Sequence, residues 1–504
     1  MRVDGVDSVS RRNSSFLVLC GVVAILLAVL LAYSQTAAFT WDEGFHLLAA
    51  QLILGGKRPY LDFCFPQTPL NACWNAGWMR ILGDTWRAAH ALASVVTAGA
   101  VLLAADFIYA RFPVAGWRLP AAITTALVLG LNVAVVEYAT VGQAYALCLF
   151  LMVAAFRVAV LAVERRGLLF TAGAGFLVSA AAASSLLTAA AAPVIVIWIL
   201  RHSPAGKRWI TLFAVTTGAA IPFLPVLWLF AQAPRAVVFN LIEYQLLYRR
   251  TNWEDATPHD LGILTSWLHS PTALLLGLLA VVGLWFVARK SAWNDGARSE
   301  FYLCGWLAAA IGAELCAAHP TFESYFVLVA PALAIPAAAG LYAIASRIRK
   351  PVPAWWPVAV LAVVLSLGLA YSLREDRNKL SWRDMEAVAR KVDDVTPLHG
   401  TLWADEHVYF LTRRPPAEGT AFSYAEVIDL PEDVAVPLHI ASDQALDRQA
   451  AAGMFGTVST CEDDEVIETL NLRRLYRQKA AAGRRCTVFW EPVGPRKPSP
   501  SGVK

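Results

Sequence analysis

The chain has 504 residues, of which 57% are hydrophobic and 16% are charged, and its mean hydropathy is +0.51. This composition is too apolar for a soluble globular protein of this length, so it predicts an integral membrane protein. The formal net charge of +4 at pH 7 is small and resides mostly in short segments between hydrophobic runs. Such a charge reports membrane topology and does not indicate a nucleic-acid partner.

Eleven hydrophobic runs are long enough for membrane spans, each of which needs about 20 residues of helix. The first run follows Arg11 and Arg12 and is interpreted as a retained helix, not a cleaved signal peptide. The Ala-rich stretch 168–200 is divided at Ser184 and Ser185, because a helix of that length would be too long for one span. The predicted spans are 15–34, 87–109, 117–137, 141–162, 168–183, 186–200, 209–230, 270–288, 301–318, 324–345 and 354–372.

Basic residues predict how these spans are oriented. With the N-terminus in the cytoplasm, the inner segments hold more than twice as many Lys and Arg residues as the outer segments. Cytoplasmic loops carry this excess in membrane proteins. We therefore expect a multi-pass protein of the cell membrane, the bacterial inner membrane, with a cytoplasmic N-terminus and an extracytoplasmic C-terminal region.

Three regions are predicted along the chain. Residues 1–372 form a polytopic α-helical membrane domain, and its first outer loop, 35–86, is the candidate catalytic loop. Residues 373–493 form a small soluble extracytoplasmic α/β domain. It begins with an amphipathic helix capped by Ser381 and contains strands near 401–404, 434–440, 456–460 and 487–490. The Pro-, Ser- and Lys-rich residues 494–504 are expected to be disordered.

The first outer loop carries an acidic pair, Asp42 and Glu43, directly after the first span. Apolar residues recur at helical spacing behind this pair as far as Gly55 and Gly56, which predicts a short helix on the membrane surface with Thr40 as its N-cap. A second short helix is expected over about 70–82. In one interpretation the pair only completes a capping box, in which Glu43 reaches back to the cap.

The other interpretation makes Asp42 a general base. A helix N-terminus lowers a carboxylate pKa and keeps it ionised, so capping and catalysis are compatible. Two further acids, Asp62 and Asp84, lie within about forty residues of Asp42, at what would be the edge of the bilayer. Charged residues kept at such a position indicate that a charged ligand is handled there. The polar and aromatic segment 231–269 is the second candidate wall of the site.

The eight cysteines fall into two groups. Four lie in predicted spans, where cysteine is most often a small hydrophobic residue. Cys461 with Cys486, and Cys64 with Cys73, lie in segments placed outside the cytoplasm, where disulfides are allowed. The cysteine and histidine spacings do not predict a metal site.

The acidic pair after the first span, followed by Gly56-x-x-Pro59-Tyr60-x-Asp62-Phe63 and Pro69-Leu70, resembles the GT-C fold membrane glycosyltransferases. Protein O-mannosyltransferases and the bacterial aminoarabinose transferases that modify lipid A are the most similar groups. Weaker matches are Gly83-x-x-x-Arg87, Gln143-x-Tyr145 and Phe322-x-x-Tyr325. The resemblance covers about residues 1–372 and lies in arrangement more than in identity.

The resemblance implies a sugar transfer from a polyprenyl-phosphate donor to an envelope acceptor (lipid, glycan or protein) on the outer face, with inversion. Asp42 would be the base, supported by Glu43, and no cofactor is required, although a divalent metal is compatible with the sequence. Expected donor-phosphate ligands are Lys57, Arg58, Arg249 and Arg250, and expected supporting or substrate-binding residues are Tyr60, Asp62, Arg87, Tyr244 and Tyr325.

The alternatives for these residues are structural. Each cation could instead snorkel to the interface, the aromatic residues could be interfacial belt residues, and Arg87 could pair with the acids or form a salt bridge at the end of a span. Gln143 stands where relatives often have an acid or arginine. The tail contains no recognisable β-trefoil module, which counts against a protein acceptor.

Two other functions are compatible with the sequence. A transporter or flippase for a lipid-linked saccharide would show more intramembrane charge and broken helices in paired halves. This chain has few charges at mid-span, Asp106 and Glu314 being the nearest. A non-catalytic scaffold of an envelope assembly would lack the base or bury it.

Overall fold

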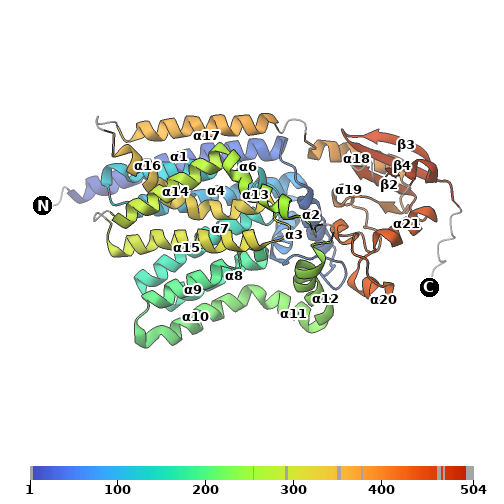
Figure 1. Cartoon of the computed structure of the whole chain (residues 1–504), viewed down its shortest axis with the longest axis horizontal. Coiled ribbons are helices and arrows are strands. Elements are labelled where there is room, and N and C mark those ends of the chain that lie inside the picture. Colours follow the sequence, from blue (N-terminus) through green and yellow to red (C-terminus); the bar gives the residue numbers. More distant parts are fainter. Residues whose placement is uncertain are drawn as a thin grey trace. The chain divides into compact units, whose positions relative to one another are not determined.

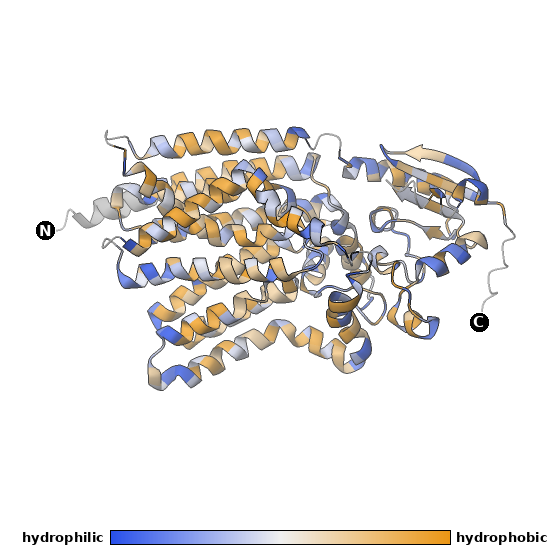
Figure 2. Ribbon diagram, in the orientation of Figure 1, coloured by the Kyte–Doolittle hydropathy of each residue, from blue (hydrophilic) through white to orange (hydrophobic). Residues whose placement is uncertain are grey.

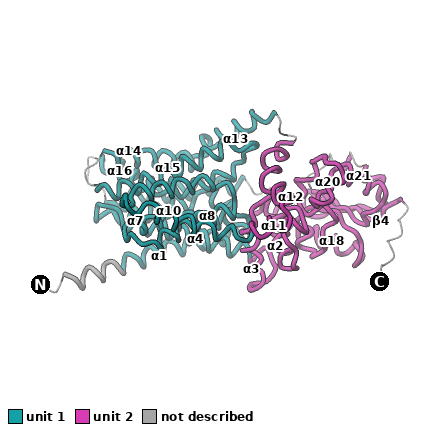
Figure 3. Tube along the Cα trace, turned by 90° about the horizontal axis from the view of Figure 1, so that it is seen from below, with its two compact units in different colours: residues 1–36, 89–225, 255–377 teal, residues 37–88, 226–254, 378–504 magenta. Residues whose placement is uncertain are grey.

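The protein is described by a computed structural model that covers residues 4–251, 253, 255–289, 293–348, 353–375, 379–461, 467–468 and 471–494. The chain divides into two compact units (Figure 3). Unit 1 comprises residues 1–36, 89–225 and 255–377, and unit 2 comprises residues 37–88, 226–254 and 378–504. Apart from Gly494, the tail expected to be disordered lies outside the described residues. The first outer loop is thus grouped with the C-terminal region, not with the membrane helices.

Unit 1 is built mainly from long apolar helices (Figures 1 and 2). Within the described residues, eight helical segments are long and apolar enough to cross a membrane, so the chain is a multi-pass membrane protein. Their helices are α1 (Asp4–Thr36), α4 (Trp86–Arg111), α7 (Tyr145–Arg165), α10 (Arg208–Ala220) continuing through η4 (Ile221–Phe223) into α11 (Leu224–Gln232), α14 (Pro271–Arg289), α15 (Asp295–Ala317), η6 (Glu323–Val329) with α16 (Ala330–Ala345), and α17 (Trp355–Glu375).

The other three predicted spans are shorter or interrupted. The run 117–137 forms α5 (Arg118–Gly130) and α6 (Val133–Tyr138), because the chain leaves the helix at Asn132, whose side chain caps α6. The Ala-rich stretch breaks where expected: α8 (Leu168–Ser184) ends at Ser185, which is extended, and η2 (Leu186–Thr188) and α9 (Ala191–His202) follow. The count of eleven spans therefore remains a prediction.

Two helix pairs in unit 1 pack backbone to backbone at glycines. A Cβ atom at Gly175 of α8 or at Gly218 of α10 would overlap a carbonyl of the other helix. Gly283 of α14 and Gly340 of α16 meet the facing backbones in the same way. Small residues at helix contacts are how membrane helices gain van der Waals packing without a hydrophobic driving force. The short helices η1 (Ala115–Trp117), η3 (Ala205–Lys207) and α13 (Thr257–His269) complete this unit.

Unit 2 combines three segments that are far apart in the sequence. The first contributes α2 (Trp41–Leu54) and α3 (Leu70–Leu82), and the second contributes α12 (Pro234–Val238) and the π-helix η5 (Phe239–Tyr248). The third contributes α18 (Trp382–Val395), α19 (Glu406–Thr412), η8 (Ser423–Ala425), α20 (Glu432–Ala435), η9 (Val436–Leu438), α21 (Asp443–Ala451), α23 (Leu472–Leu475) and a small sheet. The predicted second short helix, 70–82, matches α3.

The sheet confirms a small α/β region at the C-terminal end. It contains β1 (Leu402–Trp403), β2 (Thr457–Cys461), β3 (Tyr476–Ala482) and β4 (Cys486–Pro492) in the order β1-β2-β4-β3. Strand β1 pairs with β2 in parallel, and the other pairings are antiparallel. Cys461 and Cys486 lie opposite each other on β2 and β4 and form the expected disulfide. Cys64 and Cys73 are thiols, so the second suggested pair is not bonded.

Two strand predictions were inaccurate. The run 434–440 was expected to be a strand but forms α20 and η9, because Pro437 removes a ladder donor and the turn at Pro431 starts a helix. Strand β3 was not predicted, since its sequence YRQKAAA carries mostly exposed residues at the edge of the sheet. The predicted helix at Ser381 is confirmed as α18. Its capping box joins Ser381 and Asp384, and Met385, Val388 and Val392 are buried.

Candidate functional site

Helix α2 begins directly after Thr40, whose extended backbone (φ −143°, ψ 144°) is typical of an N-cap. The predicted capping box is wrong, because the Thr40 side chain makes no capping hydrogen bond to this helix. The Glu43 carboxylate accepts a hydrogen bond from the indole Nε1 of Trp382, at 3.0 Å. Glu43 is completely buried. This acid therefore connects α2 to α18.

Helix α2 is also not a surface helix. Eight consecutive residues, from Glu43 to Ala50, are buried, which covers every side of two helical turns. Helix α3 packs against α2 and so does α19. At the contact with α19, the imidazole of His407 lies against Gly44, and its Nε2 is 3.2 Å from the Thr40 carbonyl oxygen. Burial lowers the pKa of His407 to about 4, so this ring is neutral and donates from Nε2.

Of the two acids, Asp42 is the one that solvent reaches. It is only partly buried, and its Oδ1 accepts a hydrogen bond from the Tyr424 hydroxyl at 3.1 Å. Burial raises the pKa of Asp42, while the hydrogen bond from Tyr424 and the charge of Arg249 act in the opposite direction. The expectation that the helix N-terminus lowers this pKa is therefore wrong, because desolvation is larger. A carboxylate with a raised pKa is a stronger base, closer to the pH at which a general base works.

A second carboxylate, that of Glu406, lies close enough to Asp42 to interact with it electrostatically. Glu406, the first residue of α19, is buried and accepts the Ser423 backbone N–H at 2.7 Å. Burial raises the pKa of Glu406, and the nearby Asp42 raises it further. Burial also raises the pKa of Glu426 well above its ordinary value, with Glu406 adding to the effect. Burial and mutual repulsion thus disfavour the charged forms of the carboxylates near Asp42.

The π-helix η5 lies in the segment that was predicted as the second wall of the site. Asn240 accepts the Phe65 backbone N–H at 2.8 Å, and Gln245 Nε2 donates to the Pro66 carbonyl oxygen at 2.6 Å. These bonds hold η5 to the loop between α2 and α3. π-Helices are rare and occur frequently at functional sites. The predicted wall 231–269 is divided between the units: residues up to 254 belong to unit 2, and residues from Asp255 onward belong to unit 1.

The end of η5 supplies aromatic and basic groups to the same region. Tyr244 is buried with its ring edge toward Phe422, at a centroid distance of 5.7 Å. Arg249 is partly exposed and close enough to Asp42 to affect its ionisation, whereas Arg250 is exposed. Arg249 and Arg250, two of the expected phosphate ligands, are thus consecutive residues directly after η5.

Lys57 and Arg58 lie in the turn after α2, and both are exposed. Arg58 Nε lies 3.0 Å from Asp62 Oδ2, and Arg58 Nη1 donates to Gln232 Oε1 at 3.2 Å. The hydrogen bond and charge of Arg58 lower the pKa of Asp62, so this acid stays ionised in a local ion pair. Asp62 therefore organises the turn and holds Arg58, whose side chain is 46% exposed.

Three expected supporting residues lie elsewhere. Tyr60 is completely buried, with a positive φ of 69°, and its hydroxyl donates to the Gln67 carbonyl oxygen at 2.7 Å, so its ring is not available to a sugar. Arg87 pairs with Glu386 of α18 at 2.6 Å and covers the Trp86 ring. Tyr325 is buried in η6, in unit 1.

Sequence reasoning did not identify the partners that the C-terminal segment supplies. Tyr424, Glu406 and His407 had no motif around them, and Trp382 belonged only to the amphipathic helix predicted after Ser381. Tyr424, His407 and Trp382 each contact a residue of the first loop more than 300 positions away in the chain. Only the amphipathic pattern of α18 was visible locally.

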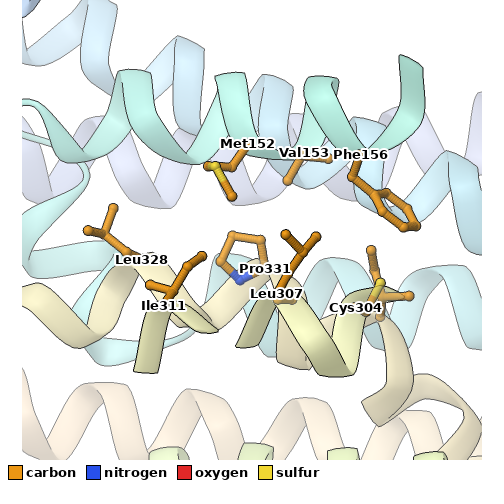
Figure 4. A pocket seen from close by; sticks show the side chains of 10 residues that line it. Met152, Val153, Phe156, Cys304, Leu307, Ile311, Leu328 and Pro331 are labelled. Atoms are coloured by element: carbon orange, nitrogen blue, oxygen red, sulfur yellow. The ribbon is translucent and has the colours of Figure 1, made fainter. Parts of the chain in front are cut away.

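The described residues contain no group of three or more His, Cys, Asp or Glu side chains placed to hold a metal ion. A small apolar cavity of about 20 Å³ lies in unit 1 between α7, α15, η6 and α16 (Figure 4). Its lining includes Met152 and Phe156 on one side and Leu307 and Pro331 on the other. It offers a sugar no hydrogen bonds.

Comparison with known proteins identifies the fold. No protein-family model matches the chain, and no curated protein matches it. Among solved structures, ArnT from Cupriavidus metallidurans bound to undecaprenyl phosphate aligns with a TM-score of 0.64 and 16% identity, over 94% of this chain and 97% of that chain. The apo form aligns with a TM-score of 0.63 and 15% identity, over 95% and 98%. The arabinosyltransferase EmbB from Mycobacterium smegmatis aligns with a TM-score of 0.47 and 14% identity, over 72% of this chain and 38% of that chain.

The chain is therefore a multi-pass membrane protein with the GT-C fold. Its similarity to the aminoarabinose transferase ArnT extends through the C-terminal region. The predicted fold class is confirmed, including the small C-terminal sheet.

Proposed function

We propose that this protein is an inverting glycosyltransferase that moves a sugar from a polyprenyl-phosphate donor to an envelope acceptor on the outer face of the membrane. The observation that carries the proposal is the setting of Asp42. It is a partly exposed carboxylate at the start of a buried helix, with a raised pKa and with Arg249 nearby. A base and a phosphate-binding cation side by side are what this transfer requires.

The reaction that fits these groups is a single displacement. The acceptor hydroxyl loses its proton to Asp42 as its oxygen forms a bond to the anomeric carbon of the donor sugar. The bond from that carbon to the phosphate oxygen breaks, and its electron pair leaves with the polyprenyl phosphate. Attack from the face opposite the leaving group inverts the anomeric configuration, and no further reactant is needed.

The leaving phosphate gains negative charge as this bond breaks, so fixed cations near it stabilise the transition state. Lys57, Arg58, Arg249 and Arg250 are the proposed ligands, because all four lie in unit 2 and are partly or fully exposed. The undecaprenyl phosphate carried by the ArnT structure supports a donor of this chemical class. Tyr244 and Glu43 are proposed to support the site from beneath its surface.

We also propose that unit 2 faces outward from a bacterial inner membrane and that the N-terminus is cytoplasmic. The distribution of basic residues supports this orientation, because cytoplasmic loops hold the excess of Lys and Arg. The disulfide between Cys461 and Cys486 supports it independently, since disulfides persist in oxidising compartments.

The test is a transfer assay with the purified full-length protein. It is incubated with a panel of radiolabelled polyprenyl-phosphate sugars and with an envelope extract, and the label is followed from the lipid to the acceptor. We expect at least one donor to lose its label in the presence of wild-type protein and not in the presence of Asp42→Asn. Equal label movement with both proteins would contradict a role for Asp42 as base.

A transporter would give a different result. In sealed proteoliposomes it would move the intact labelled lipid between leaflets without cleaving the sugar from the phosphate. Such movement, with all the label still attached to the lipid, would replace the proposed activity by transport.

A further inference from the structure

The hydroxyl of Tyr424 donates to Asp42 across 382 positions of sequence. Tyr424 lies in η8, a single turn whose backbone is held by Glu406, which accepts the N–H of Ser423. The Tyr424 ring also lies beside Phe45 and Phe422, at centroid distances of 6.1 Å and 5.6 Å. The ring is therefore supported from α2 and from its own loop.

Building on the proposed function, we propose that Tyr424 is a positioning residue for the catalytic base. Its hydrogen bond occupies Oδ1 of Asp42 and leaves Oδ2 to take the proton of the acceptor hydroxyl. Tyr424 is 44% exposed although it holds a carboxylate, so it stands at the surface where an acceptor would approach. A tyrosine that served only the hydrophobic core would be buried, as Tyr409 of α19 is.

The C-terminal segment thus supplies the residue that holds the proposed base in place. A carboxylate at the start of a helix is free to rotate about its side-chain torsions unless a partner holds one oxygen. Bases that are fixed in orientation are productive more often, because the reacting atoms must align within fractions of an ångström. The Tyr424 hydroxyl can hold Asp42 in this way without competing for a proton, since a phenol, with an ordinary pKa of about 10, stays protonated over the pH range of the reaction.

The charges around Asp42 predict how the effect will be detected. The facing groups are Tyr424 of η8, Glu406 of α19 and Arg249 after η5. The hydrogen bond from Tyr424 favours the ionised form of Asp42, as does the charge of Arg249, while a negative charge on Glu406 disfavours it. Removing the Tyr424 hydroxyl must therefore raise the pKa of Asp42 further.

The experiment compares Tyr424→Phe with wild type in kcat and KM from pH 5 to pH 9. A hydrogen bond of ordinary strength corresponds to roughly a 3- to 10-fold effect. We expect the lost orientation to lower kcat of Tyr424→Phe at every pH, and the lost hydrogen bond to lower it by about that factor more on the acidic side, with KM for the donor unchanged. An acidic limb that coincides with that of wild type would overturn the proposal, because a hydrogen bond that positions the Asp42 carboxylate must also favour its ionised form.

Tyr476→Phe is the matched control. Tyr476 is buried in the sheet of the same unit, and its hydroxyl donates to the Phe455 carbonyl oxygen at 2.9 Å. This variant loses one phenol hydrogen bond without touching Asp42, so its pH profile should keep the wild-type shape. A shifted acidic limb in Tyr476→Phe would show that any loosening of the unit moves the profile, and would overturn the specific role of Tyr424.

A readout without turnover separates this inference from the proposed function. The carbonyl-stretch band of protonated carboxyl groups is recorded by infrared spectroscopy against pH, and Asp42→Asn identifies the contribution of Asp42. In Tyr424→Phe that contribution should persist to higher pH than in wild type. If no donor is turned over, the proposed function fails while this titration still decides the inference. Superimposable titrations of the two proteins would reject it.

Discussion

Gly44 of helix α2 lies directly against the imidazole of His407, so that a Cβ atom at this position would stand 2.5 Å from His407 Nδ1. The ring cannot move away easily, because it is buried, stacks on Phe39 and is held at the Thr40 carbonyl oxygen. The close approach of α2 and α19 therefore requires a residue without a side chain, immediately after the two acids.

Gly44→Ala should destabilise the protein by about 1–3 kcal/mol, as overpacking of a buried contact does. Thermal unfolding in detergent, followed by intrinsic fluorescence, measures the effect. Gly77→Ala on α3 is the matched control, because nothing lies within 4 Å of a Cβ there. Alanine in that helix should be neutral or slightly stabilising. Equal melting temperatures for Gly44→Ala and wild type would mean that α2 and α19 separate freely.

Asp42→Asn should reduce sugar transfer by roughly 10²- to 10⁴-fold with near-normal expression, because asparagine still accepts the Tyr424 hydrogen bond but cannot take a proton. The comparison variants are Asp62→Asn and Asp84→Asn. Asp62 pairs with Arg58, and Asp84 accepts from Gln51, at 2.9 Å. Both should retain transfer within about tenfold of wild type. If one of these acids proves indispensable while Asp42→Asn stays active, the base is misassigned.

The buried pair of Glu43 and Trp382 predicts a graded series. Glu43→Gln keeps an acceptor for the indole and should behave nearly as wild type, whereas Glu43→Ala leaves a buried donor unsatisfied and should lose about 1–3 kcal/mol of stability. Trp382→Phe removes the donor, and its ring can keep the stacking on Trp86. In that background Glu43→Ala should lose less stability than in the wild type. Additive losses in the double variant would show that the hydrogen bond contributes nothing.

Buried His407 predicts a loss of stability in mild acid. Its pKa is lowered by burial to about 4, from an ordinary value of 6.5, so the unfolded chain binds the proton first as the pH falls. Stability is complete above about pH 6.5 and is lost between there and pH 4, by up to about 3 kcal/mol. The raised pKa values of Asp42 and Glu406 act in the opposite direction, so the comparison with His407→Gln isolates the imidazole. The variant should lose less stability over this range, and parallel curves would contradict the assignment.

The disulfide between Cys461 and Cys486 links residues 25 positions apart. Cys461→Ser should lose ~3 kcal/mol of stability by the chain-entropy model. Alkylation without reductant should leave these two cysteines unmodified and label Cys73, which is exposed. Labelling of Cys461 in protein taken from intact cells would contradict an outward-facing unit 2, because a cytoplasmic domain would remain reduced.

Local patterns were sufficient for the helices of the first loop. The predicted limits of α3 agree with the structure, and α2 ends at Gly55 as expected, because hydrophobic spacing and glycine stops depend only on neighbouring residues. The position of Asp42 in the first turn of α2 could be predicted for the same reason. The raised pKa of Asp42 could not, since the groups that bury it come from elsewhere in the chain.

Long-range contacts explain the remaining errors. The motif Thr40-x-x-Glu43 satisfies the local rule for a capping box, but the Thr40 side chain makes no capping hydrogen bond, and Glu43 accepts from the indole of Trp382, 339 positions away in the chain. A surface helix was predicted for α2 because nothing in its own sequence indicates that α19 covers it. Tyr424 sits in a stretch without periodicity or charge pattern, so no sequence rule would have selected it.

The three-segment construction of unit 2 has a consequence for biosynthesis. Asp42 and Glu43 leave the ribosome early, whereas Trp382 and Tyr424 follow only after nearly all the membrane helices. At roughly 5–20 residues per second, the nascent acids wait tens of seconds for their partners. During that interval α2 has α3 beside it but lacks α19, so the face that α19 covers stays open. Any sugar transfer can begin only once translation is almost finished.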